Sequence, residues 1–168
     1  MPARDRAAFT LVLLFVLAAL TLELYFVVHH DHLSGRADLA ARAFAFYGRG
    51  DRGYYDHVSN FELGLESFNI LFTQGLNLLL LAGILRRSVW RYPLQLSVSS
   101  YVCYSTTLYL LSNHLSEYAE MPRHDVASML IFYGPNLPWV LGTGWLAWDA
   151  VRAISTAFRE VEPEAPAI

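Results

Sequence analysis

Two carboxyl groups lie inside otherwise apolar stretches of this 168-residue chain. Glu23 lies near the end of LVLLFVLAALTLELYFVV at 11–28, and Glu66 lies near the start of a second apolar stretch at 60–85. A charged side chain at membrane depth costs about 2.5–3.5 kcal/mol on insertion scales, and so marks a site or a paired structural charge. At 1.5 Å of rise per residue, both glutamates are expected about 8–9 Å inside the same membrane face. Two carboxyl groups at one depth on consecutive helices can share a pocket.

Further polar residues follow helical spacing around this expected pocket. In the stretch 127–154, Asn136 is expected about 13 Å from the same face, with Trp139 one turn deeper and Tyr133 one turn shallower. Pro135 and Pro138 should kink this helix and free backbone carbonyls. In the stretch 60–85, steps of 4, 3, 4 and 4 place five polar residues on one helical face: Glu62, Glu66, Asn69, Thr73 and Asn77.

These residue types suit proton transfer to and from carbon. Two carboxyl groups in one low-dielectric site favour a state in which one is protonated and the other ionised. An indole face stabilises a nearby cation. Together they favour protonation of an alkene, a carbocation, and loss of a proton from a neighbouring carbon. The candidate catalytic residues are Glu23, Glu66, Asn136 and Trp139, and the candidate substrate-binding residues on the helices are Glu62, Asn69, Thr73, Tyr101, Tyr104 and Tyr133.

Structural roles are the alternatives for several of these residues. Glu62, near the expected membrane interface, also suits helix capping or snorkelling. Glu23 and Glu66 also fit a buried structural pair, and Asn136 also fits hydrogen bonding between helices. His29, His30 and His32 have no second ligand group at metal-site spacing and are interpreted as interface residues, so no metal site is expected.

The elements that must position these groups are long apolar helices. The chain is 55% hydrophobic, 14% aromatic and only 16% charged, and no charged residue occurs in 68–85 or 94–112. A soluble helical domain would carry charge on an outer face at helical period. We therefore predict an all-α membrane protein: a four-transmembrane-helix bundle with a polar intramembrane pocket. Its spans are 7–28, 60–85, 93–115 and 127–154, within a single domain at 1–158 followed by a flexible acidic tail at 159–168.

The distribution of Arg residues predicts the membrane topology, and the net charge argues against nucleic acid as a partner. Seven of the twelve Arg residues fall on the side of the two termini, so the positive-inside rule places both termini in the cytoplasm. A net charge of −3 is too small to indicate nucleic-acid binding. The expected location is a multi-pass position in the endoplasmic reticulum of a eukaryote, or in the inner or plasma membrane of a bacterium.

Five segments resemble, in order, the emopamil-binding protein family of sterol delta-8/delta-7 isomerases, within the EXPERA group. They are LELYFVV, YGRGDRGY, NFELGLES, YPLQLSVSSYVCYSTTLYLL and NLPWVLGTGWLAWDAV, between about Leu20 and Val151. The resemblance implies a four-helix membrane isomerase that moves a ring double bond without a cofactor.

The resemblance also implies roles for individual residues. Glu23 and Glu66 would be acid and base, Asn136 would orient a carboxyl group, and Trp139 would face the cation. The loop residues that match the family, and would close or line the entrance, are Tyr47, Asp51 and Tyr54. One departure is Ala19, where the family usually has a histidine one turn before the first glutamate.

The leading hypothesis is therefore a cofactor-independent isomerase of a sterol or related polycyclic isoprenoid. Two alternatives are a non-catalytic sterol- or lipid-binding protein of the same fold, which Ala19 favours, and a terpenoid cyclase that uses the same acid pair. The expected partners are the isoprenoid substrate and membrane lipid, and a homodimer is left open.

Overall fold

Helices are the only regular secondary structure in residues 1–161, which are the residues described by the computed structural model. In chain order they are α1 (Ala3–Ala18), η1 (Ala19–Glu23), α2 (Leu24–His29), η2 (His30–Gly35), α3 (Leu39–Tyr47), η3 (Arg52–Tyr54), α4 (Asn60–Phe68), η4 (Asn69–Thr73), α5 (Gln74–Leu85), α6 (Arg91–Leu115) and α7 (Val126–Val161). The predicted all-α class is confirmed. The predicted tail begins inside α7, which continues to Val161, and its remaining residues 162–168 lie outside the described range.

Four long helical segments make up most of the molecule. Two of them, Ala3–Gly35 and Asn60–Leu85, have the length and composition of membrane spans, with mean hydropathies of 2.6 and 1.7. Only 28% and 33% of their most apolar windows is buried, whereas the core helix of a soluble protein is mostly buried. Helices α6 and α7, of 25 and 36 residues, are long enough to cross a bilayer but are more polar.

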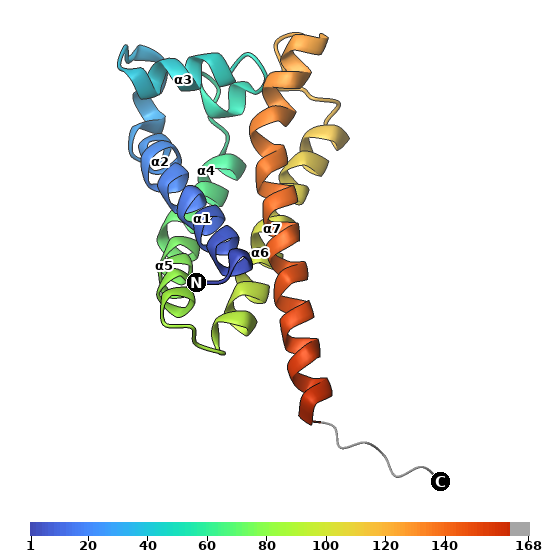
Figure 1. Cartoon of the computed structure of the whole chain (residues 1–168). Coiled ribbons are helices and arrows are strands. Elements are labelled where there is room, and N and C mark those ends of the chain that lie inside the picture. The colour runs from blue at the N-terminus through green and yellow to red at the C-terminus, as the bar shows by residue number, and fades with distance from the viewer. Residues whose placement is uncertain (162–168) are drawn as a thin grey trace.

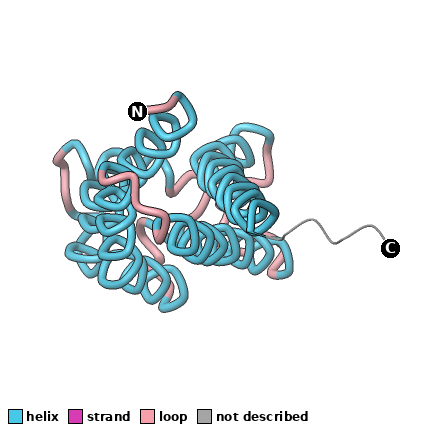
Figure 2. The backbone as a smooth tube through the Cα atoms, turned by 60° about the horizontal axis from the view of Figure 1, so that its bottom comes forward, coloured by secondary structure: helices cyan, strands magenta, loops and turns pink. Residues whose placement is uncertain are grey.

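The four segments lie side by side, and the shorter helices cover one end (Figure 1). Helix α1 packs against α5 and α7, α2 packs against α4, and α6 packs against α5 and α7. The view of Figure 2, closer to end-on, shows the same grouping of helical tubes. Helix α3 crosses the end of the molecule that lies opposite the N-terminus (Figure 1).

Residues 39–54, comprising α3 and η3 with the turn between them, are called the lid. Asp38 caps α3 by accepting the backbone N–H of Ala41 at 3.2 Å. The turn approaches α7 so closely at Gly50 that a Cβ there would lie 2.8 Å from the backbone nitrogen of Phe132, so no larger residue fits without movement. The Arg52 N–H also donates to the Glu120 carbonyl at 2.9 Å. The lid is therefore fixed against α7 and the α6–α7 connection.

Two hydrophobic clusters lie at different levels of the molecule. One joins α1, α5 and α7 through residues such as Val12, Ile84 and Leu146. The other joins α2, the lid, α6 and α7, with Phe26 and Phe132 fully buried. Glu23 and Glu66 occupy chain positions between these clusters, so the polar groups lie between two apolar layers.

Buried polar contacts attach the N-terminal turn of α1 to α6 and α7. The Arg91 guanidinium pairs with Asp5, and both residues are at most 9% exposed. Asp149, at 2% exposure, pairs with Arg4 and accepts from the Gln95 side chain at 2.9 Å. These contacts lie at the end of the helices away from the lid.

Candidate functional site

A cavity of about 470 Å³ lies among the lid, the first two long segments and α7. Its walls are mainly apolar and aromatic, with contributions from Phe26, Phe44 and Pro135. The polar or amphipathic groups that line it are Glu23, Glu66, Asn136, Trp139, Tyr47 and Tyr54. The structure thus brings together all four residues that the sequence proposed as catalytic.

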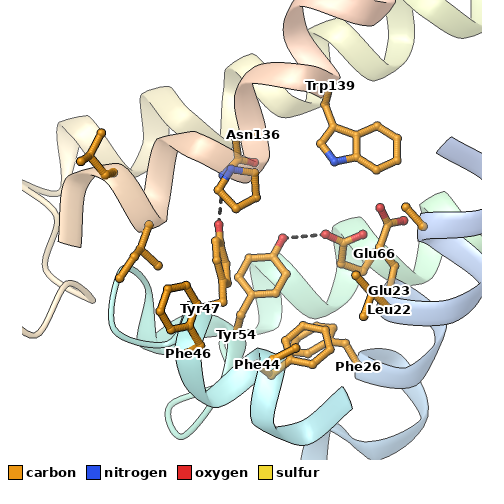
Figure 3. Close-up of a pocket in the computed structure, with 15 residues that line it drawn as sticks. Leu22, Glu23, Phe26, Phe44, Phe46, Tyr47, Tyr54, Glu66, Asn136 and Trp139 are labelled. Carbon is orange, nitrogen blue, oxygen red and sulfur yellow. Dashed lines mark hydrogen bonds between the residues drawn. The ribbon is translucent and has the colours of Figure 1, made fainter. Parts of the chain in front are cut away.

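The carboxyl groups of Glu23 and Glu66 lie beside one another in this cavity, and the Trp139 side chain extends toward them from α7 (Figure 3). One face of its indole is stacked on Phe15. Glu66 is 8% exposed, and its Oε1 accepts the Tyr54 hydroxyl at 2.6 Å. Glu23 accepts from the Asn69 amide. Each carboxyl group therefore has one donor from another element, which fixes its orientation toward the other.

Glu23 lies in the π-helical turn η1, whereas Glu66 lies in α4, three residues before the π-helical turn η4. The two π-helical turns contact each other. In η1 the Leu24 N–H closes the turn on the Ala19 carbonyl, and in η4 the Gln74 N–H closes it on the Asn69 carbonyl. Each bond reaches five residues back instead of four. Such turns are rare and occur frequently at functional sites. The bond from Asn69 to Glu23 joins the two turns.

The π turn at η4 also aligns a row of side-chain amides that ends at Glu23. Asn77 donates to the Gln74 side-chain oxygen at 3.2 Å, and Gln74 donates to the Asn69 side-chain oxygen at 3.3 Å. Because the oxygen of Asn69 is occupied in this way, its NH₂ group is directed to Glu23. The amide that contacts a carboxyl group is thus Asn69, whereas the resemblance gave that role to Asn136.

Asn136 instead holds the lid. Its side-chain nitrogen donates to the Tyr47 hydroxyl at 3.0 Å and to the Phe132 carbonyl at 2.7 Å. The Tyr47 hydroxyl lies 3.1 Å from that of Tyr109, which donates to Asp51. A continuous row of polar groups therefore runs from the cavity wall on α7, through α3 and α6, to the turn of the lid.

Burial raises the pKa of Asp51 above its usual range, although hydrogen bonds from Tyr109 and the Gly53 N–H act in the opposite direction. The folded protein therefore binds a proton at Asp51 more readily than the unfolded chain does. Protonation of Asp51 therefore favours the folded state. This contribution to the free energy of unfolding is fully present below the unfolded-state pKa of about 3.9, and it is lost as the pH rises through the raised folded-state pKa.

We expect Asp51→Asn to remove this dependence, because the amide keeps an acceptor oxygen and carries no charge. The difference between the unfolding temperatures of variant and wild type should move in favour of the variant as the pH rises from about 4 to about 7. The check is thermal unfolding of both proteins in the same detergent across this range. Parallel curves would show that Asp51 does not titrate differently on folding.

The structure places the other candidate residues in three environments. Asn69 and Tyr101 line a smaller chamber of about 50 Å³ behind the carboxyl pair. Thr73 and Glu62 are buried but line neither cavity, Glu62 lying under the lid beside Gly53. Asp51 is likewise buried behind Tyr109.

Two tyrosines require a correction. Tyr104, expected to bind substrate together with Tyr101, is 64% exposed on the outside of α6, because three residues turn a helix by only about 300°. Tyr133, expected near Asn136, forms a hydrogen bond of 2.7 Å with Tyr118 and lines neither cavity.

Glu62 does not cap its helix, since Ser59 accepts the N–H groups of Phe61 and Glu62.

Residues that the spacing argument omitted complete the site. Gln74 stands one position beyond the predicted polar stripe, and only the extra residue of the π turn brings its side chain to Asn69. Phe26 and Phe44 were indistinguishable from ordinary core residues in the sequence. Ser105 and Thr106 belong to a run of hydroxyl residues on α6, which was the available signal for the smaller chamber.

A comparison of the sequence with models of protein families identifies the family of the chain. The model of the EXPERA (EXPanded EBP superfamily) family matches residues 39–150, which is two thirds of the chain. The matched range contains the lid, Glu66, Asn136 and Trp139, whereas Glu23 precedes it. A search of curated proteins gave no match.

Proposed function

The chain belongs to the EXPERA (EXPanded EBP superfamily) family and is a membrane protein, and from this premise we propose that it is a cofactor-independent isomerase. The proposed reaction shifts a ring double bond in a sterol or related polycyclic isoprenoid. The observation that carries this proposal is the pair of carboxyl groups, Glu23 and Glu66, that lie near Trp139 inside a mainly apolar cavity.

The proposed reaction moves one proton in and one proton out. One carboxylic acid of the pair protonates a carbon of the double bond and becomes a carboxylate. The positive charge then forms on the neighbouring carbon, where the face of the Trp139 indole that is not stacked on Phe15 stabilises it. The carboxylate of the other glutamate removes a proton from the next carbon, and a new double bond forms. No electrons are exchanged with a second reactant, so the reaction requires no redox cofactor.

The volume and the lining of the cavity suit an apolar polycyclic substrate. Its volume of about 470 Å³ is within the range of roughly 300–1,000 Å³ that is usual for small-molecule sites. Its lining includes three apolar side chains that are also exposed at the molecular surface, namely Leu22, Phe46 and Leu130. They come from η1, the lid and α7, so an apolar substrate could pass between these elements from surrounding lipid.

We also propose that all four long segments cross the membrane, with both termini in the cytoplasm. Large apolar side chains are exposed on the outside of each of them: Leu14, Leu79, Leu111 and Leu141 are each 48–67% exposed. Apolar surface of this extent is normally buried against a partner or lipid, and contact with lipid would bury the exposed side chains of all four segments together. The membrane would be the endoplasmic reticulum or, in a bacterium, the inner membrane.

Replacement of Trp139 should reduce turnover more than substrate binding. A desolvated cation–π contact contributes about 2 kcal/mol, so Trp139→Leu should lower kcat roughly 30-fold. Trp139→Phe should retain part of the rate, because a weaker aromatic face remains. Trp148→Leu is the matched control, since Trp148 is on the same helix but 55% exposed. Equal kcat values for Trp139→Leu and this control would remove the cation-stabilising role.

The proposed function is tested with the full chain in lipid vesicles and a delta-8 sterol. Conversion to the delta-7 sterol, measured by mass spectrometry after chromatographic separation, is the expected result, while the Glu23→Gln/Glu66→Gln double variant should bind the sterol without converting it. Tight binding by the wild type without any conversion would overturn the isomerase proposal and leave the lipid-binding alternative, which Ala19 favours.

A further inference from the structure

Two hydrogen-bonding atoms on the wall of the main cavity have no partner within residues 1–161. Apart from the carboxyl pair, the side chains of this wall that carry a hydrogen-bonding group are Tyr47, Tyr54, Asn136 and Trp139. The Tyr54 hydroxyl donates to Glu66 at 2.6 Å. The Tyr47 hydroxyl accepts from Asn136 at 3.0 Å. The two atoms that remain are the side-chain oxygen of Asn136 and the indole nitrogen of Trp139.

The hydrogen bonds of Asn136 leave its side-chain oxygen without a donor. Its nitrogen lies 2.7 Å from the Phe132 carbonyl, and because a carbonyl only accepts, the amide cannot be turned over. The same nitrogen donates to the Tyr47 hydroxyl. The hydrogen of Tyr47 is in turn directed to Tyr109, since Tyr109 donates its own hydrogen to Asp51. Both N–H groups of Asn136 are therefore occupied, and its acceptor oxygen is open to the cavity.

The indole of Trp139 offers the complementary group, a donor. The Trp139 carbonyl accepts from Thr143 within α7, whereas the ring N–H donates to no atom of the described residues. Figure 3 shows the indole nitrogen on the edge of the ring that is directed away from the α7 ribbon, into the cavity. An indole N–H in an apolar surrounding usually has a hydrogen-bond partner. This N–H is therefore available to a ligand.

These two groups are three residues apart on α7, so they are neighbours on one side of the helix. A hydroxyl group both donates and accepts, so one hydroxyl can satisfy the Asn136 oxygen and the Trp139 N–H together, whereas a ketone only accepts and a hydrocarbon does neither. We propose that Asn136 and Trp139 bind a hydroxyl group of the substrate, which is then an alcohol and not an isoprenoid hydrocarbon. This inference rests on the proposed isomerase function.

The hydroxyl site is compatible with the role of Trp139 in the proposed reaction. A hydroxyl that accepts from the indole N–H lies in the plane of the ring, about 2.9 Å from the nitrogen. The carbocation lies over the ring face opposite Phe15, within about 6 Å of the ring centre. A sterol carries its hydroxyl on the ring next to the one that reacts, so a single rigid molecule can reach both places. Binding of the hydroxyl would then determine which ring carbon lies beside the carboxyl pair.

The test compares three delta-8 substrates that differ at one carbon: the sterol, its ketone and the hydrocarbon without the oxygen. The kcat/KM of each is measured with the full chain in lipid vesicles. The hydrocarbon should have a kcat/KM roughly 10–100-fold below that of the sterol, because it leaves both a donor and an acceptor unpaired in the cavity. The ketone should fall between them, because it accepts from Trp139 but leaves the Asn136 oxygen unpaired.

Trp139→Phe isolates the contribution of the indole N–H. Both substrates form the same cation, so any loss of cation stabilisation cancels in the ratio of the sterol and hydrocarbon kcat/KM values. This ratio should fall roughly threefold to tenfold, the contribution of one neutral hydrogen bond. Trp148→Phe is the matched control, since Trp148 is on the same helix but 55% exposed. It should keep the wild-type ratio.

Asn136→Leu isolates the amide oxygen, and Tyr47→Phe is its matched control. Asn136→Leu removes the acceptor and also the bond from α7 to the lid. Tyr47→Phe removes the same bond to the lid but retains the Asn136 oxygen. Loss of the lid bond affects both substrates alike. The ratio of sterol to hydrocarbon should therefore fall in Asn136→Leu and keep its wild-type value in Tyr47→Phe.

A wild-type ratio near one, or ratios in Trp139→Phe and Asn136→Leu that equal the wild-type ratio, would overturn the hydroxyl site and leave the isomerase intact. An absence of product from all three substrates would instead overturn the proposed function. Dissociation constants, measured by displacement of a radiolabelled delta-8 sterol, then test the hydroxyl site without turnover. Weaker binding of the hydrocarbon in the wild type, with a smaller difference in Trp139→Phe, supports the site. Equal constants, or no sterol binding, overturn it.

Discussion

Glu66→Gln is expected to lower kcat by roughly 10²–10⁴-fold, the contribution of a positioned general acid or base, while the protein keeps its fold. The amide has almost the shape of the carboxyl group and can still accept the Tyr54 hydroxyl through its oxygen. It can neither deliver nor accept the transferred proton. Glu23→Gln should give a loss of similar size, because each turnover requires both members of the pair.

The matched control for this prediction is Glu62→Gln. Glu62 lies one turn before Glu66 on α4 and is comparably buried, at 5% exposure. It lines neither cavity, so its replacement should change kcat less than about threefold. The measurement is sterol conversion in vesicles, with helical content and sterol binding measured on the same samples. Wild-type rates for Glu66→Gln and Glu23→Gln would exclude the acid–base assignment.

The second large effect is on stability. Arg91→Met should destabilise the protein by about 3–5 kcal/mol, because it leaves the Asp5 carboxylate buried without its partner. A loss of this size corresponds to a fall in unfolding temperature on the order of 10 °C. Arg86→Met, an exposed residue of the same α5–α6 turn, should have little effect.

Removal of both charges of the Asp5–Arg91 ion pair should have a smaller effect than removal of one. Removing both charges with Asp5→Leu and Arg91→Leu should recover much of the lost stability, because no unpaired buried charge remains. Thermal unfolding in one detergent, with helical content as the signal, compares all four proteins. An Arg91→Met variant as stable as the wild type would mean that the buried pair does not hold α1 against α6.

The sequence predicted the helices better than it predicted their local geometry. The expected segment 60–85 coincides with Asn60–Leu85, and the expected segment 93–115 differs from α6 by two residues at its start. Apolar length and charge-free stretches were sufficient for this, because backbone polar groups in an apolar surrounding favour a helix. Whether all four segments cross a membrane stays a prediction.

Helical spacing could not give the details of the site. The π turns at η1 and η4 depend on contact between two segments that are distant in the chain, and a regular period of 3.6 residues assumes that no such turn occurs. For the same reason Gln74 was overlooked and Asn69 was given no link to Glu23. Tyr104 was expected to bind substrate, but its side chain is exposed on the outside of α6.

The sequence predicted the position of the lid but not the hydrogen bonds that it forms. The family resemblance indicated that Tyr47, Asp51 and Tyr54 close or line the entrance, and α3 and η3 do cover the end of the helices (Figure 1). The bonds from Tyr54 to Glu66 and from Asn136 to Tyr47 join residues 12 and 89 positions apart. Pairings over such distances carry no local signal in a single sequence.

The most direct test of proton transfer by the carboxyl pair is a single turnover in deuterated water. The wild-type protein in vesicles is equilibrated in this solvent, and is then mixed with less than one equivalent of a delta-8 sterol. We expect a delta-7 product with one deuterium, at the ring carbon that receives the proton. A delta-7 product without deuterium at that carbon would contradict proton transfer by the pair.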